Sequence, residues 1–92
     1  MGSMIITLYL PDSRSLKDKR RIVQSILTRI RNKHRVAASE VDGLATWSKA
    51  VLGFACVANT HGHARDVLES IVRWVELNWD VDVIDSRIEI FS

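Results

Sequence analysis

A run of basic residues between Arg14 and Arg35 offers the clearest chemistry in the sequence. It holds nine of the thirteen lysines and arginines of the chain and a single acid, Asp18. At helical spacing most of these cations fall opposite an apolar stripe, so they form an exposed ridge. We expect a polyanion-binding surface made of Lys17, Lys19, Arg20, Arg21, Arg29 and Arg31. Phosphate contacts of this kind give affinity with little sequence choice, so RNA or a ribosomal particle is the expected partner, and a merely solvated helix face is the alternative.

Lys19 differs from the other cations, because its helical angle places it within the apolar stripe. It lies near the start of the predicted helix, where a lysine can reach water along its alkyl stem. It therefore either points into the groove beside the turn after the first strand or extends to solvent.

Residues that could support catalysis or metal binding are few. Glu40 and Asp42 alternate in a predicted strand, so they project from one face, but no nucleophile or histidine is placed to complete a mechanism. His61 and His63 lack a fixed third ligand for a metal. We expect no catalytic residue, no metal site and no cofactor, and hence no enzyme.

The third predicted strand resembles part of the RNA-recognition signature. Residues 52–59 match it at Gly53, Phe54, Ala55 and Val57 but lack its basic opening residue and two aromatics. Tyr9 and Phe54 would then be the available base platforms. The alternative is that the open sheet face pairs two copies of the chain, through an apolar surface formed by Tyr9, Leu52, Phe54 and Cys56.

Composition limits the organisation of the chain. With 92 residues, 47% hydrophobic and 26% charged, it has room for one globular domain, expected over residues 4–92. Residues 1–3 have the composition of a cloning remnant. No apolar run reaches the length of a membrane span, and the single cysteine excludes an internal disulfide. A cytoplasmic protein without membrane contact is expected.

Periodicity predicts four strands and two helices. The strands are expected at residues 4–10, 36–41, 47–58 and 81–91, and the helices at about 15–34 and 60–79. This β-α-β-β-α-β order favours an α+β ferredoxin-like fold, with an antiparallel four-stranded sheet and both helices on one face. Trp47, Trp74 and Trp79 are expected to anchor the core and its rim rather than to stack on a ligand.

Several short motifs together resemble the YlxP-like proteins, a family of small uncharacterised bacterial proteins. They are residues 15–21 (Ser-Leu-Lys-Asp-Lys-Arg-Arg), 39–42 (Ser-Glu-Val-Asp), Trp47, Lys49, Ala50, Leu52, Gly53, Val57 and Asn59. The resemblance implies a ferredoxin-like fold, and a ribosome- or RNA-linked role because genes of that family often lie among those for translation and ribosome maturation factors. A polar His-x-Asp-like turn often follows Glu-Val-Asp in the family. Here Gly43, Leu44 and Ala45 stand instead, so any chemistry of that turn is unsupported.

Three functional hypotheses follow. The first is a non-enzymatic protein that binds RNA or a ribonucleoprotein through its basic first helix. The second is a structural module that forms a homodimer through its open sheet face and has no nucleic-acid role. The third is a small-ligand or regulatory domain, since this fold supports many functions.

Overall fold

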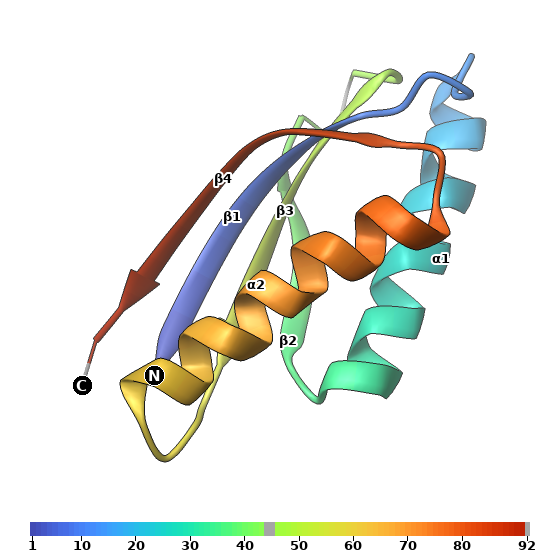
Figure 1. Ribbon diagram of the computed structural model, residues 1–92. Coiled ribbons are helices and arrows are strands. Elements are labelled where there is room, and N and C mark those ends of the chain that lie inside the picture. Colours follow the sequence, from blue (N-terminus) through green and yellow to red (C-terminus); the bar gives the residue numbers. More distant parts are fainter. Residues whose placement is uncertain (44–45, 92) are drawn as a thin grey trace.

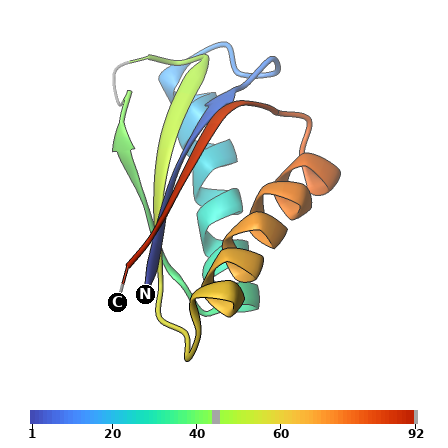
Figure 2. The same cartoon turned by 60° about the vertical axis from the view of Figure 1, so that its left-hand side comes forward.

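Within residues 1–43 and 46–91, which the computed structural model describes, the chain forms four strands and two helices in the expected order. The elements are β1 (Gly2–Tyr9), α1 (Leu16–His34), β2 (Ala37–Asp42), β3 (Lys49–Cys56), α2 (His61–Asn78) and β4 (Asp82–Ile90). The strands pair in the order β2-β3-β1-β4, and every neighbouring pair is antiparallel. Both helices cover the same face of the sheet (Figures 1 and 2). The predicted α+β ferredoxin-like fold is confirmed.

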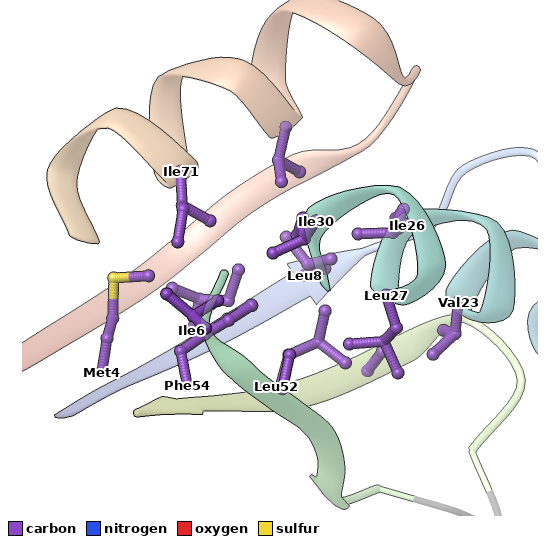
Figure 3. Close-up of a cluster of buried hydrophobic side chains, with 14 of the residues drawn as sticks. Met4, Ile6, Leu8, Val23, Ile26, Leu27, Ile30, Leu52, Phe54 and Ile71 are labelled. Carbon is purple, nitrogen blue, oxygen red and sulfur yellow. The ribbon is translucent and has the colours of Figure 1, made fainter. Parts of the chain in front are cut away.

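The core lies between the sheet and the helices. In β1, Met4, Ile6 and Leu8 are buried, whereas Ile5 and Tyr9 are exposed on the open face. The helices supply the other side of the core through buried residues at helical spacing, which are Val23, Ile26, Leu27, Ile30, Ala64, Leu68, Ile71 and Val75. Figure 3 shows how side chains of α1, α2 and the central strands meet there. Burial of this apolar surface is the main force that holds the two layers together.

The facing of β3 is opposite to the one predicted. Leu52, Phe54 and Cys56 were expected on the open face, but they are only 0%, 3% and 5% exposed and belong to the core. The pairing of β3 with β1 explains this, because Leu52 lies opposite Ile6 and directly opposed residues share a face. Figure 3 shows Leu52 and Phe54 among the core residues. The open face of β3 is therefore built by Lys49, Val51, Gly53 and Ala55.

Local packing explains why position 53 is a glycine. A Cβ atom at this position would lie 2.9 Å from Cγ1 of Val41, which packs across it from β2 on the open face. The match of residues 52–59 to an RNA-recognition signature is thus accounted for by strand packing. The open face carries no Phe54 ring for base stacking.

Local sequence sets the ends of the helices. Ser15 caps α1 by accepting a hydrogen bond from the Asp18 amide at 3.1 Å, and the Asp18 carboxylate accepts one from the Arg14 amide at 3.1 Å. Thr60 caps α2 in the same way, through the His63 amide.

In the described part of the chain, neither helix is apolar over enough of its length to cross a membrane.

The first strand begins earlier than predicted. Strand character was expected from Met4, but β1 begins at Gly2, which is buried and lies opposite Cys56 and Ile90. Its Cβ would lie 2.9 Å from Cδ1 of Ile90. Residues 2 and 3 are therefore paired parts of the sheet.

Candidate functional site

Three exposed cations on the first turns of α1 form a surface that we call the basic ridge: Lys17, Arg20 and Arg21. Residues three and four apart on a helix are neighbours, so these side chains lie on one side of α1. Ion pairs within the described residues link Lys19 to Glu40, Arg65 to Glu69 and Arg87 to Asp85, and none involves the ridge. The nearest acid in sequence, Asp18, uses its carboxylate in the cap. The charge of the ridge is thus available to an external anion.

Lys19 was predicted to bind a polyanion, and the structure contradicts this. Its residue surface is only 2% exposed, and its ammonium group lies 2.8 Å from Oε2 of Glu40 and also donates to the carbonyl oxygen of Gly43. The expectation that it extends to solvent is wrong as well. A buried ammonium group needs compensating partners, and β2 with the turn after it provides them.

Arg31 was also expected in the polyanion surface, but its guanidinium is already engaged. Nε and Nη2 donate to the carbonyl oxygen of Ala38 at 3.1 and 2.6 Å. Ala38 lies in the edge strand β2, so this contact joins α1 to the sheet. Arg31 remains exposed, but it is a structural bridge rather than a free member of the basic ridge.

Arg29 belongs to a cluster that joins the C-terminal halves of the two helices. Its guanidinium lies 4.8 Å from the ring centre of Trp79 and 5.6 Å from that of Trp74. Lys33 lies 5.2 Å from the Trp74 ring, and His34 meets Trp74 edge to face at 5.4 Å. These cation–π contacts hold the guanidinium of Arg29 against α2, so Arg29 lies outside the basic ridge, and its role in a polyanion surface stays a prediction. The two tryptophans are core and rim anchors, as expected.

His34 has an unusual environment within this cluster. Burial, and then the neighbouring charge of Lys33, lower the pKa of its imidazole below the ordinary value. Its Nε2 is buried without a hydrogen-bond partner in the described structure. The neutral ring is therefore the form that suits the fold.

Glu40 and Asp42 do not form an acid–base pair. The β2–β3 register shifts between them, and this irregularity breaks the alternation on which the prediction rested. Glu40 faces Lys19, whereas the Asp42 carboxylate accepts from the adjacent Gly43 amide at 2.7 Å. The Oε2 atom of Glu40 is buried, and its contact with Lys19 is an ion pair without hydrogen-bond geometry. Both carboxylates thus take part in local structural contacts. Leu44 and Ala45, where the sequence departs from the family pattern, lie outside the described residues.

His61 and His63 are exposed in the first turn of α2. No group of three or more histidine, cysteine, aspartate or glutamate side chains is arranged to hold a metal ion among residues 1–43 and 46–91. Cys56 is buried within the core. Among the described residues, His61 and His63 are therefore not part of a metal-ligating group.

The loop before α1 and the turn between β2 and β3 meet at one end of the molecule (Figures 1 and 2). The buried Ser13 donates its hydroxyl hydrogen to the carbonyl oxygen of Trp47, and the Leu10 amide donates to the carbonyl oxygen of Ser48 at 2.8 Å. These two segments border a cleft of about 530 Å³. The cleft is lined by Tyr9, Leu10, Pro11, Ser13, Arg14, Trp47 and Ser48. Sequence reasoning missed this cleft. Its signal in the sequence was a tryptophan, Trp47, shortly after the turn-forming Asp42 and Gly43, where a large apolar side chain has little to pack against.

The open face of the sheet has an apolar part and a charged part. A shallow hollow of about 320 Å³ lies over β1, β2 and β3, and is lined by Ile5, Ala37, Ala38, Ser39, Gly53, Phe54 and Ala55. Along β4, Asp85, Arg87 and Glu89 lie opposite the open-face residues of β1. Of the predicted self-association residues, only Tyr9 is exposed there, at 45%.

Comparison with known proteins agrees with the resemblance seen in the sequence. The chain matches the family described as "Protein of unknown function (DUF503)" over residues 1–88. It is similar to the "Uncharacterized protein YlxP" of Bacillus subtilis (strain 168), with 30% identity over 80 residues, which cover 87% of each chain. The predicted YlxP-like relationship is confirmed.

Proposed function

Because the chain belongs to the DUF503 family, whose description names no activity, we propose a function from its surface chemistry: it is a non-enzymatic cytoplasmic protein that binds structured RNA or a ribonucleoprotein through the basic ridge. The observation that carries the proposal is the set of three exposed cations with no acidic partner among the described residues. Phosphate groups are the anions that such a helix face would meet along a nucleic acid.

The position of these charges in the helix supports the proposal. The N-terminal end of a helix is the positive end of its dipole, so acids stabilise it and cations oppose it by about 0.3–1 kcal/mol each. Lys17 nevertheless lies in the first turn of α1 and Arg14 lies just before it. Local rules of stability are typically broken where function requires it. An anion bound at this end would interact favourably with the side chains and with the helix dipole together.

The test is the salt dependence of RNA binding, measured by fluorescence anisotropy with a labelled RNA duplex. We expect the double variant Arg20→Glu/Arg21→Glu to lose most of its affinity. Each lost phosphate contact should also reduce the slope of log affinity against log salt by about one. The matched control is Arg65→Glu/Arg73→Glu, which changes the net charge equally on α2 and should bind much more like the parent protein.

Two outcomes would overturn the RNA proposal. One is affinity of the parent protein that does not change with salt. The other is equal binding by the Arg20→Glu/Arg21→Glu variant and the parent protein.

A second function is favoured by a different observation, the apolar hollow on the open sheet face. Its lining of small and apolar side chains would suit self-association, in which two copies bury Ile5 and Ala55. Sedimentation at micromolar concentration should then show a dimer, and Ala55→Arg should convert it to a monomer. A parent protein that sediments as a monomer would contradict this alternative.

A further inference from the structure

Two half-exposed aromatic rings lie in the cleft beside the start of α1. Trp47 is 49% exposed and Tyr9 is 45% exposed, and both line the cleft of about 530 Å³ together with Arg14. This volume lies within the range of ligand-binding clefts. Arg14 immediately precedes Ser15, the cap of α1, so the cleft adjoins the helix end that carries the basic ridge.

The backbone that carries the Trp47 ring is held by two hydrogen bonds from the loop before α1. The Ser13 hydroxyl donates to the carbonyl oxygen of Trp47 itself, and the next carbonyl, of Ser48, accepts from the Leu10 amide at 2.8 Å. Ser13 is only 2% exposed, so this anchor is buried. The protein thus fixes the backbone from which the indole projects and leaves Trp47 49% exposed. A backbone that is ordered before binding loses less conformational entropy when a partner binds.

The other tryptophans show why this ring is the available one. Trp74 and Trp79 have the cationic groups of Arg29 and Lys33 over their rings, and they pack against each other at 5.1 Å. Trp47 takes part in no cation–π or aromatic pair of the described structure.

We propose that this cleft binds an unpaired base of an RNA strand whose phosphates lie on the basic ridge. The inference rests on the proposed function and adds to it the kind of RNA, one with a single-stranded segment next to the helix contact. Aromatic rings stack on any base, because every base has a π face. Arg14 would pair with the adjoining phosphate or stack beside the base. The binding surface is then the end of the sheet beside the loops, where β1 ends and β3 begins, and not the centre of its open face.

The experiment compares three labelled RNA probes: a short oligouridine, an abasic strand of the same length, and a duplex of the same length. We expect the parent protein to bind oligouridine about tenfold more tightly than the abasic strand, as for one stacked base. Trp47→Ala should remove this preference, and Trp47→Phe should retain most of it. Both variants should bind the duplex as the parent protein does, because the ridge is intact.

Controls separate stacking from folding and from the wider proposal. Leu77→Ala removes an apolar side chain that is 84% exposed on α2, and should leave all three affinities unchanged. Tyr9→Ala provides a second variant of the cleft, expected to weaken oligouridine binding alone. Equal binding of oligouridine and the abasic strand, with salt-dependent duplex binding, would overturn the base site and leave the ridge standing. Failure to bind all three probes would overturn the proposed function itself.

Discussion

Lys19 is a charged residue that the fold places in its interior. Its side chain is 3% exposed, and that of its partner Glu40 is 19% exposed. Such pairs rarely add net stability over apolar residues, but removing one member leaves the other without compensation. The pair also connects α1 to β2, and through Gly43 to the turn that follows. It therefore fixes the helix end that carries the basic ridge.

Replacing Lys19 with methionine should destabilise the protein strongly. We expect Lys19→Met to lower the free energy of unfolding by about 3 kcal/mol, the lower end of the range for a broken buried pair, because Glu40 can partly reach water. Urea denaturation measures this change. The exposed neighbour provides the control, and Lys17→Met should alter stability by less than about 0.5 kcal/mol.

The double variant Lys19→Met/Glu40→Leu tests the cause. It should recover a large part of the lost stability, because neither charge then remains buried and alone. If Lys19→Met were as stable as Lys17→Met, the ion pair would have no structural role.

Sequence could identify which side chains are cationic, but not which of them are free. The helical angle correctly placed Lys17, Arg20 and Arg21 on an exposed side. It could not show that Lys19 and Arg31 are engaged, because each donates to a backbone carbonyl group, 24 and 7 residues away along the chain. Backbone carbonyl groups leave no mark in a sequence pattern, so such contacts are visible only in the folded chain.

At the scale of elements, the junction of α1 with α2 depends on an aromatic and cationic cluster. The imidazole of His34 contacts Trp74 edge to face, with an interplanar angle of 73°. It remains neutral more readily than an exposed histidine, because burial and Lys33 lower its pKa. Protonation would place a charge at the packed end of both helices.

This predicts a loss of stability in mild acid. As the pH falls through about 6.5, the unfolded chain protonates His34 while the folded chain does not, so the unfolded state binds more protons and stability decreases. The decrease continues until the pH reaches the lowered pKa of the folded state. The measurement is the thermal midpoint at about pH 7.5 and about pH 5.5, on the two sides of this transition.

His34→Phe is the variant that isolates this effect. It retains an aromatic edge against Trp74 and removes no hydrogen bond from the buried Nε2. Its thermal midpoint should fall less between the two pH values than that of the parent protein, and His61 and His63 are present in both proteins. An identical fall would assign the acid sensitivity to other groups.

The identity of each element was easier to predict than its facing. Periodicity located both ends of α1 and α2 to within one residue, because both helices have strong helical patterns. In β3 apolar residues occupy both faces, so a shift of one residue looks equally good in the sequence. Only the pairing of Leu52 with Ile6 decides the matter, and that register is a property of the assembled sheet.

At the scale of the whole molecule, the charges are separated. Residues 36–92 contain four basic and nine acidic residues, although the chain as a whole carries a net charge of +2. In the folded protein the basic ridge lies on α1, whereas Asp82, Asp85 and Glu89 lie along the edge strand β4. A polyanion would therefore approach the α1 side and be repelled from β4. The order of the elements along the chain was enough to predict the fold. The separation of basic and acidic residues in space was visible only in the structure.

The hydrogen bonds between the loop before α1 and the β2–β3 turn also constrain how the chain can vary. Leu10 and Ser13 of this loop, and Lys19 of α1, each donate to a backbone carbonyl group between β2 and β3. An insertion in the loop before α1 would displace the donors, and one between β2 and β3 would displace the acceptors. Relatives that preserve these contacts should therefore keep both loop lengths, and a change in one should be accompanied by a change in the other.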